Sequence, residues 1–328
     1  MKKLLFIMNP KAGRGAIRNE IFDIIVLFSQ AGYEVTVYPT TGPDDAQRKV
    51  REDGAGYDML VCAGGDGTLD NTVSGYMQLN QAQIPLGYIP IGTTNDFGRS
   101  LRISRRPLEA AYQIVNGKES KIDVGKLGDR SFIYIAAFGI FTEVSYNTNQ
   151  NLKKALGHSA YVLEGIRNLV GYKGYEITAS FDEKVISGTY IYGMVTNTLS
   201  VGGFKLRGAK HVILDDGKFD CLFIKMPTNP EELQQILTGI VQNDIEGNEM
   251  FFESKASKVV IHSQEEISWT VDGEYGGTYK DIEIQNMKQA LTILLEDIPT
   301  DEMAYQGERK VESVWEYDVD NEDTTGWD

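Results

Sequence analysis

The sequence predicts an α/β protein in two parts, in which an open parallel sheet is followed by an antiparallel, strand-rich part. Over residues 1–130, apolar runs alternate with helical segments, as in parallel sheets whose strands are linked by helices. Over residues 131–298, short runs with alternating apolar residues dominate, which is typical of antiparallel strands. Residues 299–328 form an acidic tail. The 328 residues suffice for two domains.

Four short apolar runs mark the expected strands of the first part. A parallel strand that is buried on both faces has a continuous apolar sequence. The expected strands are residues 4–8, 33–40, 59–63 and 86–91. The expected helices are residues 21–28, 44–53 and 69–77. In the first and last of these helices, apolar residues recur at helical spacing.

The second part consists mainly of expected strands. Their apolar runs lie at residues 132–136, 190–195, 219–224, 258–261, 267–271, 282–284 and 291–295. Two segments, residues 152–169 and 231–241, have the spacing of helices. Because no low-complexity linker separates the two parts, we expect them to pack closely.

The negative charge of the chain is concentrated at its end. The sequence has 47 acidic and 32 basic residues, which gives a formal net charge of −15. The tail holds ten acidic residues against Arg309 and Lys310, and so carries more than half of that charge. Such tails are usually solvated, and a docking role is the alternative. The overall acidity excludes a general nucleic-acid-binding protein, which needs a broad basic surface.

Two distant cysteines, Cys62 and Cys221, give neither a disulfide framework nor the spacing of a zinc site, and they suit a reducing compartment. The apolar run at residues 4–8 is too short for a signal peptide. No run approaches the ~20 apolar residues that a membrane-spanning helix needs. We therefore expect a cytoplasmic protein that at most touches the inner face of a membrane.

Three glycine-containing turns follow three of the expected strands, at residues 9–15, 64–68 and 92–96. In a parallel sheet these turns meet at the carboxyl edge, where such folds bind ligands. Glycine lets the backbone approach a phosphate closely, and a following helix offers free N–H groups. Each turn alone could be an ordinary turn, but three at one edge favour a phosphate site. The sequence contains neither the dinucleotide fingerprint nor the P-loop pattern.

Six motifs stand out in the sequence, namely NPKAG, GGDGT, GTTNDFGR, KIDVG, LDDG and VDGEYGG, at residues 9–13, 64–68, 92–99, 121–125, 214–217 and 271–277. Together they resemble the diacylglycerol kinase catalytic family. This family includes bacterial lipid kinases and sphingosine kinases, and it is distantly related to NAD kinases. The resemblance covers residues 1–298, is closest to the diacylglycerol kinases of Gram-positive bacteria, and implies their fold.

The resemblance implies that the first part binds ATP. Phosphoryl transfer requires the triphosphate to be held and its charge to be offset by Mg²⁺. Asp66 is implied to hold Mg²⁺ or its water shell, and the alternative is that Asp66 only caps the helix that follows. The residues implied to contact the nucleotide are Asn9, Pro10, Lys11, Ala12, Gly13, Thr40, Gly64, Gly65, Asp66, Gly67, Thr68, Thr93, Thr94, Asn95 and Asp96.

The resemblance also implies that the base for the acceptor hydroxyl comes from Asp272-Gly273-Glu274. Apolar and polar residues alternate over residues 267–274, so Asp272 and Glu274 share a face if the strand stays extended to its end. Two nearby carboxylates tend to differ in proton affinity, which suits one as the base and the other as its support. We expect Asp272, helped by Glu274, to accept the proton, although the sequence does not decide between them. The alternative is a plain polar strand end.

A second, structural Mg²⁺ site is implied at residues 213–218. Asp216 would supply a carboxylate, and the backbone carbonyls of Ile213 and Lys218 would complete the site. From residue chemistry alone, this segment is a turn, because Asp-Gly is a strong hairpin signal.

One basic cluster, formed by Arg99, Arg102, Arg105 and Arg106, stands out in the acidic sequence. Anionic lipid headgroups attract such segments by about 1 kcal/mol per basic residue near the surface. The implied substrate, diacylglycerol or a similar lipid, requires contact with a membrane, so an anionic membrane surface is the expected partner. A solvated face is the alternative. The resemblance further implies a homodimer.

Two departures from the family pattern concern charged residues. After the GGDGT motif the family has Leu-Asn-Glu, whereas this chain has Leu69-Asp70-Asn71. The carboxylate is one residue closer to the helix start, where we expect it to crowd phosphate oxygens or to adjust metal contacts. Some relatives carry Lys where this chain has Glu164, a change that would alter headgroup preference or weaken activity.

Together the motifs predict an ATP-dependent kinase that phosphorylates the hydroxyl of diacylglycerol and gives phosphatidic acid. One alternative is a kinase for another lipid alcohol, sphingoid or glycerol-based. A second is a nucleotide-binding paralogue without turnover. An NAD kinase is disfavoured, because the motifs at residues 95–99 and 272–274 belong to the lipid-kinase branch.

Overall fold

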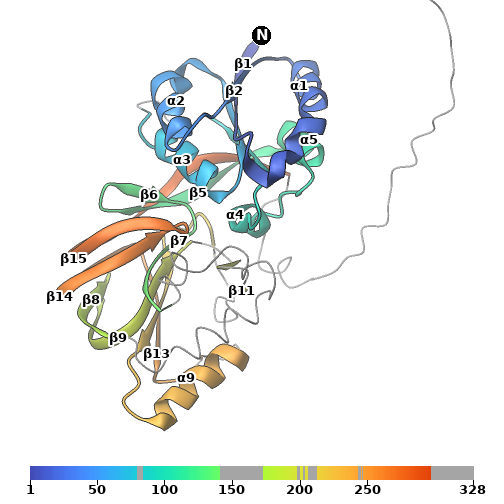
Figure 1. Cartoon of the computed structure of the whole chain (residues 1–328). Helices are drawn as coiled ribbons and strands as arrows, with labels where there is room; N and C mark the ends of the chain where they lie inside the picture. The colour runs from blue at the N-terminus through green and yellow to red at the C-terminus, as the bar shows by residue number, and fades with distance from the viewer. Residues whose placement is uncertain are drawn as a thin grey trace, which may run out of the picture.

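The computed structural model describes residues 1–79, 84–140, 173–197, 200–201, 204–205, 213–242, 245 and 247–296. Figure 1 shows the arrangement of these residues, coloured by position along the chain. The helix expected at residues 152–169, Glu164 within it, and the acidic tail lie outside the described residues.

The first part is a parallel sheet with helices on both faces. Its strands run in the order β4-β3-β1-β2, and each neighbouring pair is parallel, as the sequence predicts. β3 and β4 are buried along their whole length, as expected of strands covered on both sides. The elements are β1 (Lys2–Met8), η1 (Ala12–Asn19), α1 (Ile21–Gln30), β2 (Tyr33–Pro39), α2 (Asp45–Asp53), η2 (Gly54–Gly56), β3 (Met59–Gly64), α3 (Asp66–Tyr76), β4 (Leu86–Pro90), α4 (Asp96–Ser100) and α5 (Pro107–Asn116).

Alternate residues of β1 divide the helices between the two faces of this sheet. Leu5 and Ile7 belong to a hydrophobic cluster with residues of α2 and α3, whereas Leu4 and Phe6 cluster with residues of α1 and α5. The ring of Phe6 meets Phe28 of α1 edge-on, with centroids 5.9 Å apart. Because side chains alternate along a strand, one buried strand anchors both helix layers.

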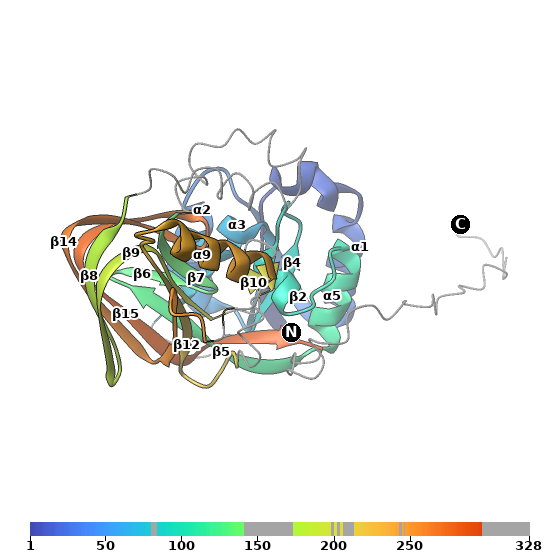
Figure 2. The same cartoon turned by 90° about the horizontal axis from the view of Figure 1, so that it is seen from below.

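The second part is built from antiparallel strands, which confirms the predicted fold class. β9 pairs with β7, β8 and β12, and β14 pairs with β7, β8 and β15. α9 packs through Ile236, which shares a cluster with Leu222 and Ile224 of β12. Figure 2 shows the second part from below, with α9 in front of its strands. The elements are β5 (Lys118–Leu127), β6 (Arg130–Phe132), β7 (Ile135–Gly139), β8 (Tyr175–Phe181), β9 (Lys184–Thr196), β10 (Ser200–Val201), β11 (Phe204–Lys205), β12 (Phe219–Lys225), α9 (Pro230–Gln242), β13 (Phe251–Ala256), β14 (Lys258–Val271) and β15 (Glu274–Leu295).

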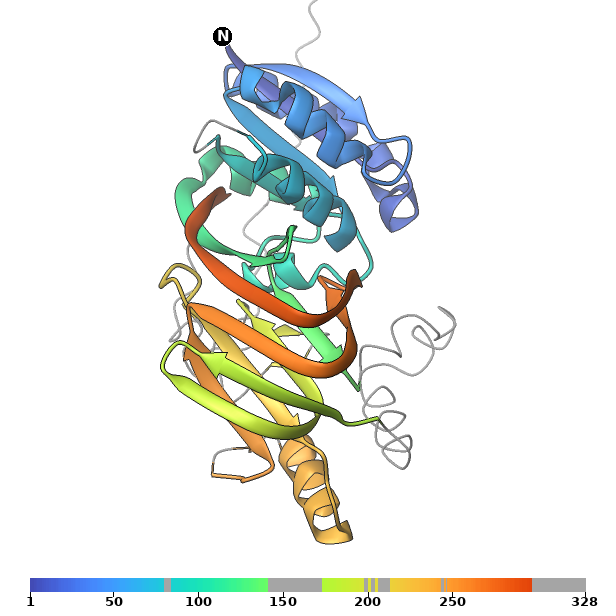
Figure 3. The same cartoon turned by 90° about the vertical axis from the view of Figure 1, so that its left-hand side faces the viewer.

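The long strand β15 joins the two parts. It begins beside β14, pairs with β5, and reaches β4, where Ile293 pairs in parallel with Leu86 (Figure 3). The two strands expected at residues 282–284 and 291–295 are therefore one strand. Its pairing with β5 shifts register between Met287 and Leu291, where Gln289 has a left-handed backbone with φ of 53°. The division of the chain at residue 130 stays a prediction.

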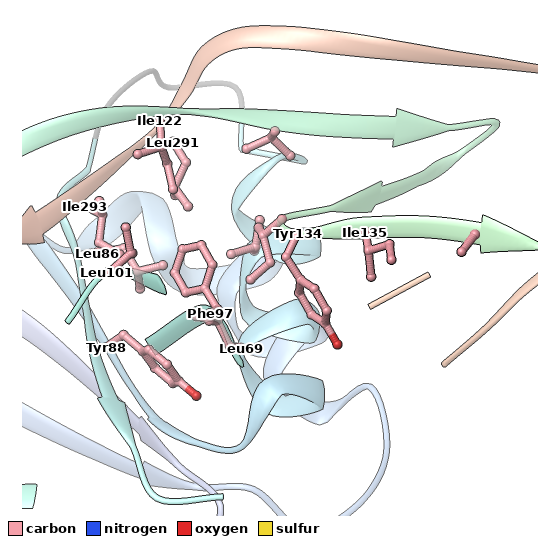
Figure 4. Packing of buried hydrophobic residues seen from close by; sticks show 14 of the residues in the cluster. Leu69, Leu86, Tyr88, Phe97, Leu101, Ile122, Tyr134, Ile135, Leu291 and Ile293 are labelled. Atoms are coloured by element: carbon pink, nitrogen blue, oxygen red, sulfur yellow. The ribbon is translucent and has the colours of Figure 1, made fainter. Parts of the chain in front are cut away.

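One hydrophobic cluster also spans both parts. It contains Leu69 of α3, Phe97 of α4, Leu291 of β15 and Tyr134, which lies between β6 and β7. Figure 4 shows the side chains of these residues gathered where the helices meet the strands. Burial of this apolar surface holds α3 and α4 against the second part. These are the two helices that begin at the predicted nucleotide motifs.

Candidate active site

The segments that follow β1, β2 and β3 are tied together at one edge of the parallel sheet. The backbone N–H of Asn9 donates to the carbonyl of Ala63 at 2.8 Å, and its Nδ2 donates to Oγ1 of Thr68 at 3.1 Å. The backbone N–H of Thr40 donates to the carbonyl of Met8 at 2.8 Å. The first two glycine turns therefore lie side by side.

The turn after β4 lies directly against the turn after β3. The N–H of Ile91 donates to the carbonyl of Gly64 at 2.9 Å, and a Cβ added at Gly92 would lie 2.5 Å from Cα of Gly65. Only glycine fits at such a close approach of two backbones. Asn95 closes the turn in a left-handed conformation, with φ of 53°. Its side chain accepts the N–H of Gly92 at 2.9 Å and donates to its carbonyl at 3.0 Å.

The other residues that the resemblance assigns to the nucleotide lie in the same three turns or at the helix starts that follow them. Thr93 and Thr94, between β4 and α4, are exposed. The helix α3 begins at this edge of the sheet, and its first backbone N–H groups have no partners within the helix. Phosphate oxygens are suitable acceptors for such groups. The remaining members of the set are Pro10, Lys11, Ala12, Gly13, Gly67 and Asp96.

Asp66 stands at the start of α3 with its carboxylate near the start of α4. Burial raises the pKa of this carboxyl, although the backbone N–H groups of Asp96, Phe97 and Asn95 act to lower it. Its Oδ1 is buried and has no hydrogen-bond partner among the residues that the structure describes. A buried carboxylate oxygen without a partner fits a ligand of a cation. The N-cap of α3 is Gly65, so Asp66 is not the cap of that helix.

Asp272 is a buried carboxylate held by backbone groups. Its Oδ2 accepts the N–H of Ile133 at 2.7 Å, and its Oδ1 accepts those of Ile135 at 2.9 Å and Tyr134 at 3.1 Å. The residue is only 3% exposed. Burial raises its pKa well above the usual value, the nearby carboxylate of Asp70 adds to this effect, and the three N–H groups oppose it.

The strand that precedes Asp272 ends at Val271. Asp272 and Gly273 both have left-handed backbones, with φ of 48° and 86°, and form the two-residue turn into β15. The strand is therefore not extended to its end, and Asp272 and Glu274 do not share a strand face. Glu274 is exposed, and its Oε1 lies 3.5 Å from a Cβ added at Gly67. One carboxylate of the turn thus points into the protein, and the other lies beside the glycine turn of α3.

Asp70 and Arg130 belong to the same arrangement. Nη2 of Arg130 lies 3.7 Å from Oδ2 of Asp70, and Nη1 donates to the carbonyl of Tyr275. Burial raises the pKa of Asp70 to about 7, Arg130 acts to lower it, and Glu274 raises it further. The sequence motifs do not indicate Arg130, and the signal for Asp70 is the departure from the family pattern at residues 70–71.

The loop expected to hold a structural Mg²⁺ forms a turn that starts after Ile213. Oδ1 of Asp216 accepts the backbone N–H of Lys218 at 2.8 Å. Nζ of Lys255 lies 4.0 Å from Oδ2 of Asp216 and 3.6 Å from Oδ1 of Asp220, so an ammonium group already faces these carboxylates. In the described part of the chain, no group of three or more His, Cys, Asp or Glu side chains could hold a metal ion. The metal site at this loop stays a prediction.

Asp123, from the KIDVG motif, anchors that loop. Its Oδ2 accepts the N–H of Gly217 at 2.6 Å, and its Oδ1 accepts the N–H of Gln289 at 2.7 Å. Its own N–H donates to the carbonyl of Leu214 at 2.7 Å. The carboxylate therefore fixes the loop against the bulge of β15.

The basic cluster lies beside the turn after β4. Arg105 donates to the carbonyl of Thr93 at 3.3 Å, and Arg106 pairs with Glu109 at 2.7 Å. Within the described ranges, no helix is long and apolar enough to cross a membrane. The four arginines are exposed, so the cluster presents positive charge next to the glycine turn after β4. Its other two exposed members are Arg99 and Arg102.

The fold and the site together define a phosphotransferase. Glycine turns at the edge of a parallel sheet offer backbone N–H groups to phosphates, and the strand-rich part brings carboxylates to the same edge. A sequence model of the diacylglycerol kinase catalytic domain matches residues 3–127.

Similar proteins cover most of the chain. The diacylglycerol kinase of Bacillus subtilis (strain 168) is 36% identical over 279 residues, which cover 84% of this chain and 91% of that protein. That of Staphylococcus carnosus (strain TM300) is 34% identical over 310 residues, which cover 93% and 99%. The crystal structure of a diacylglycerol kinase from Bacillus anthracis str. Sterne gives a TM-score of 0.74 at 26% identity, covering 90% of this chain and 97% of that one. The chain belongs to the diacylglycerol kinase family.

Proposed function

We propose that this chain is an ATP-dependent lipid kinase, which transfers the γ-phosphate of ATP to the hydroxyl of diacylglycerol and gives phosphatidic acid. The observation that carries the proposal is the approach of Glu274 to Gly67, because it brings a carboxylate of the second part to a glycine turn of the first. The relatives named above match most of the chain and support diacylglycerol as the acceptor.

ATP binds at the edge formed by the three glycine turns. The turn at residues 64–68 and the start of α3 hold phosphate oxygens through backbone N–H groups. Because Gly65 and Gly92 have no side chains, the backbones of two of these turns can meet at this edge. Thr40 follows β2 and Thr94 follows β4, so both lie at the carboxyl edge of the sheet and complete the contacts with the nucleotide.

Asp66 is the residue that fits a magnesium ion bound together with ATP. One oxygen of its carboxylate is buried and unpartnered among the described residues, and the backbone at the start of α4 fixes its place. When bound, Mg²⁺ offsets the negative charge of the phosphate oxygens.

The geometry favours Glu274 over Asp272 as the group that accepts the hydroxyl proton. A general base must come within hydrogen-bond reach of the substrate. Both oxygens of Asp272 accept backbone hydrogen bonds in the interior, whereas Glu274 is exposed beside Gly67. We therefore assign to Asp272 the holding of the turn and to Glu274 the acceptance of the proton. This reverses the order expected from the sequence.

The lipid acceptor places the reaction at a membrane surface, which we propose to be the cytoplasmic face. The exposed arginines beside the turn after β4 attract anionic headgroups to the side of the protein where ATP binds. The homodimer stays a prediction.

The test uses purified protein, labelled ATP and diacylglycerol in mixed micelles. Labelled phosphatidic acid that forms only with Mg²⁺ is the expected result. Sphingosine and monoacylglycerol in the same assay distinguish kinases for other lipid alcohols. If ATP raises the melting temperature but no acceptor is phosphorylated, the chain is a nucleotide-binding paralogue and the proposal is wrong.

A further inference from the structure

Arg130 links the two parts of the protein at the proposed active site. It begins β6, and its Nη2 lies 3.7 Å from Oδ2 of Asp70 in the N-terminal half of α3. Its Nη1 donates to the carbonyl of Tyr275, the residue directly after Glu274. One guanidinium therefore connects the helix that starts at the phosphate turn with the strand that carries the proposed base.

Asp70 is buried although it is ionisable. It is 4% exposed, and its Oδ1 has no hydrogen-bond partner within the described part of the chain. A cavity of about 380 Å³ lies beside Asp70 and Arg130, and its wall includes Asp44, Lys126 and Asp129. Burial of a carboxylate is costly unless a positive charge compensates it. Buried ionisable groups with shifted pKa values cluster at functional sites. The position of Asp70 near Asp272 therefore indicates a role in the proposed active site.

We propose that Asp70 and Arg130 are positioning residues, which hold the turn of Asp272 and Glu274 against α3 for phosphoryl transfer. The inference rests on the proposed function, since it assigns two more residues to the same site. Neither residue touches the substrate in this role. Arg130 fixes the backbone next to Glu274, and Asp70 fixes the guanidinium of Arg130.

The charges around Asp70 couple it to the turn. Burial raises the pKa of Asp70 to about 7, and Arg130 from β6 opposes this effect, whereas Glu274 from β15 adds to it. Asp70 in turn raises the pKa of Asp272. The carboxyls of Asp70 and Asp272 therefore titrate together rather than singly. The other titratable groups near the pair are Asp44, Lys126, Asp129 and Tyr134.

Removal of either charge is expected to move the pH dependence of activity, and in opposite directions. Asp70→Asn removes a negative charge, so the neighbouring carboxyls ionise more easily and the acid limb of kcat/KM moves to lower pH. Arg130→Met removes a positive charge, so the limb moves to higher pH. For groups that interact this strongly, we expect shifts of about one pH unit. A purely structural role would lower activity without moving the limb.

The experiment measures kcat and KM for ATP between about pH 5 and 9, with diacylglycerol in mixed micelles. Asp70→Asn and Arg130→Met are expected to lower kcat by roughly tenfold and to change KM much less, because misplaced groups slow the chemical step. Arg130→Lys keeps the charge and is expected to restore the position of the limb. Asp129→Asn, an exposed neighbour at the same cavity, is the matched control and is expected to keep the wild-type profile.

A second measurement needs no substrate. The pKa of Asp70 is raised in the folded protein. The contribution of its carboxyl to the free energy of unfolding therefore falls as pH rises from about 4 through about 7. The melting temperature of Asp70→Asn relative to wild type is therefore expected to increase over that range.

Three outcomes overturn the inference, namely an acid limb that stays in place in Asp70→Asn, a shift in the same direction in both charge-removing variants, or a melting-temperature difference that is independent of pH. If the wild type does not phosphorylate diacylglycerol, the proposed function fails. The melting temperatures then still decide whether Asp70 titrates as the pair requires.

Discussion

The Oδ2 atom of Asp272 lies 2.7 Å from the backbone nitrogen of Ile133 and accepts its hydrogen bond. This contact joins residues 139 positions apart and fixes the turn between β14 and β15 to the segment between β6 and β7. The same carboxylate also accepts the N–H groups of Tyr134 and Ile135. The carboxylate of Asp272 therefore fixes the backbone of this turn. Glu274, two residues later in the sequence, lies beside Gly67 in the glycine turn of α3.

Asp272→Asn is expected to destabilise the protein. The amide nitrogen of Asn cannot accept the hydrogen bond of Ile133, so a buried N–H group loses its partner, at a cost of about 1–3 kcal/mol. The control is Asp182→Asn. Asp182 also has a left-handed backbone and accepts N–H groups, from Ser257 and Lys258, but it is exposed and water can replace those bonds. Urea unfolding of both variants measures the difference, and an equal or larger loss in Asp182→Asn would contradict the account.

Gly92→Ala is expected to impair nucleotide binding. The added Cβ would lie 2.5 Å from Cα of Gly65 and force apart two of the turns that hold ATP. Overpacking of this kind typically costs about 1–3 kcal/mol in stability. Gly42→Ala is the matched control, because a Cβ there meets no atom within 4 Å. Calorimetry with ATP is expected to show weaker binding in Gly92→Ala alone, and unchanged binding in both would exclude this contact as a requirement.

Asp45 is expected to stabilise the fold at neutral pH. The N–H of Thr41 lowers the pKa of Asp45 to about 2, and the side chains of Tyr38 and Arg48 add to the effect. Since the folded-state pKa is below the unfolded one, the stabilisation is present above about pH 4 and is lost as pH falls through about 2. Asp45→Asn is therefore expected to be less stable than wild type at pH 7, with a difference that narrows toward pH 3. A difference that grows on acidification would refute this.

The basic cluster is expected to bind anionic membranes. Arg102→Glu reverses one charge, so binding to phosphatidylglycerol vesicles is expected to weaken by roughly tenfold or more at low salt. Arg51→Glu, on the exposed side of α2, makes the same charge change away from the cluster. Co-sedimentation with vesicles compares the two variants. Equal loss in both would show that only net charge matters.

The sequence predicts the parts of the site that local chemistry decides. The apolar runs locate β1, β3 and β4 within two residues of their observed ends, because buried parallel strands must be apolar on both faces. Gly92 and Asn95 are recognisable as turn residues, since few other types adopt a tight or left-handed turn. Because each glycine turn directly follows a parallel strand, the turns are expected to meet at the carboxyl edge of the sheet.

The contacts that complete the site could not be predicted in this way. Arg130 reaches Tyr275 across 145 positions, and Asp272 reaches Ile133 across 139, whereas periodicity reports only on near neighbours. The left-handed backbone of Asp272 also breaks the alternation that the strand pattern assumed. The departure at residues 70–71 marked Asp70 as unusual, but its burial against Arg130 depends on packing between the two parts.

The most direct test of the account is the turnover of Glu274→Gln with ATP and diacylglycerol. Gln keeps the size of the side chain but cannot accept the hydroxyl proton, so we expect phosphatidic acid to form at least ~100-fold more slowly than with wild type. Its melting temperature is expected to stay near that of wild type, because Glu274 is exposed. Glu283→Gln, an exposed carboxylate of the same strand that pairs with Lys258, is expected to keep the wild-type rate. Formation of phosphatidic acid by Glu274→Gln at the wild-type rate would contradict the central claim.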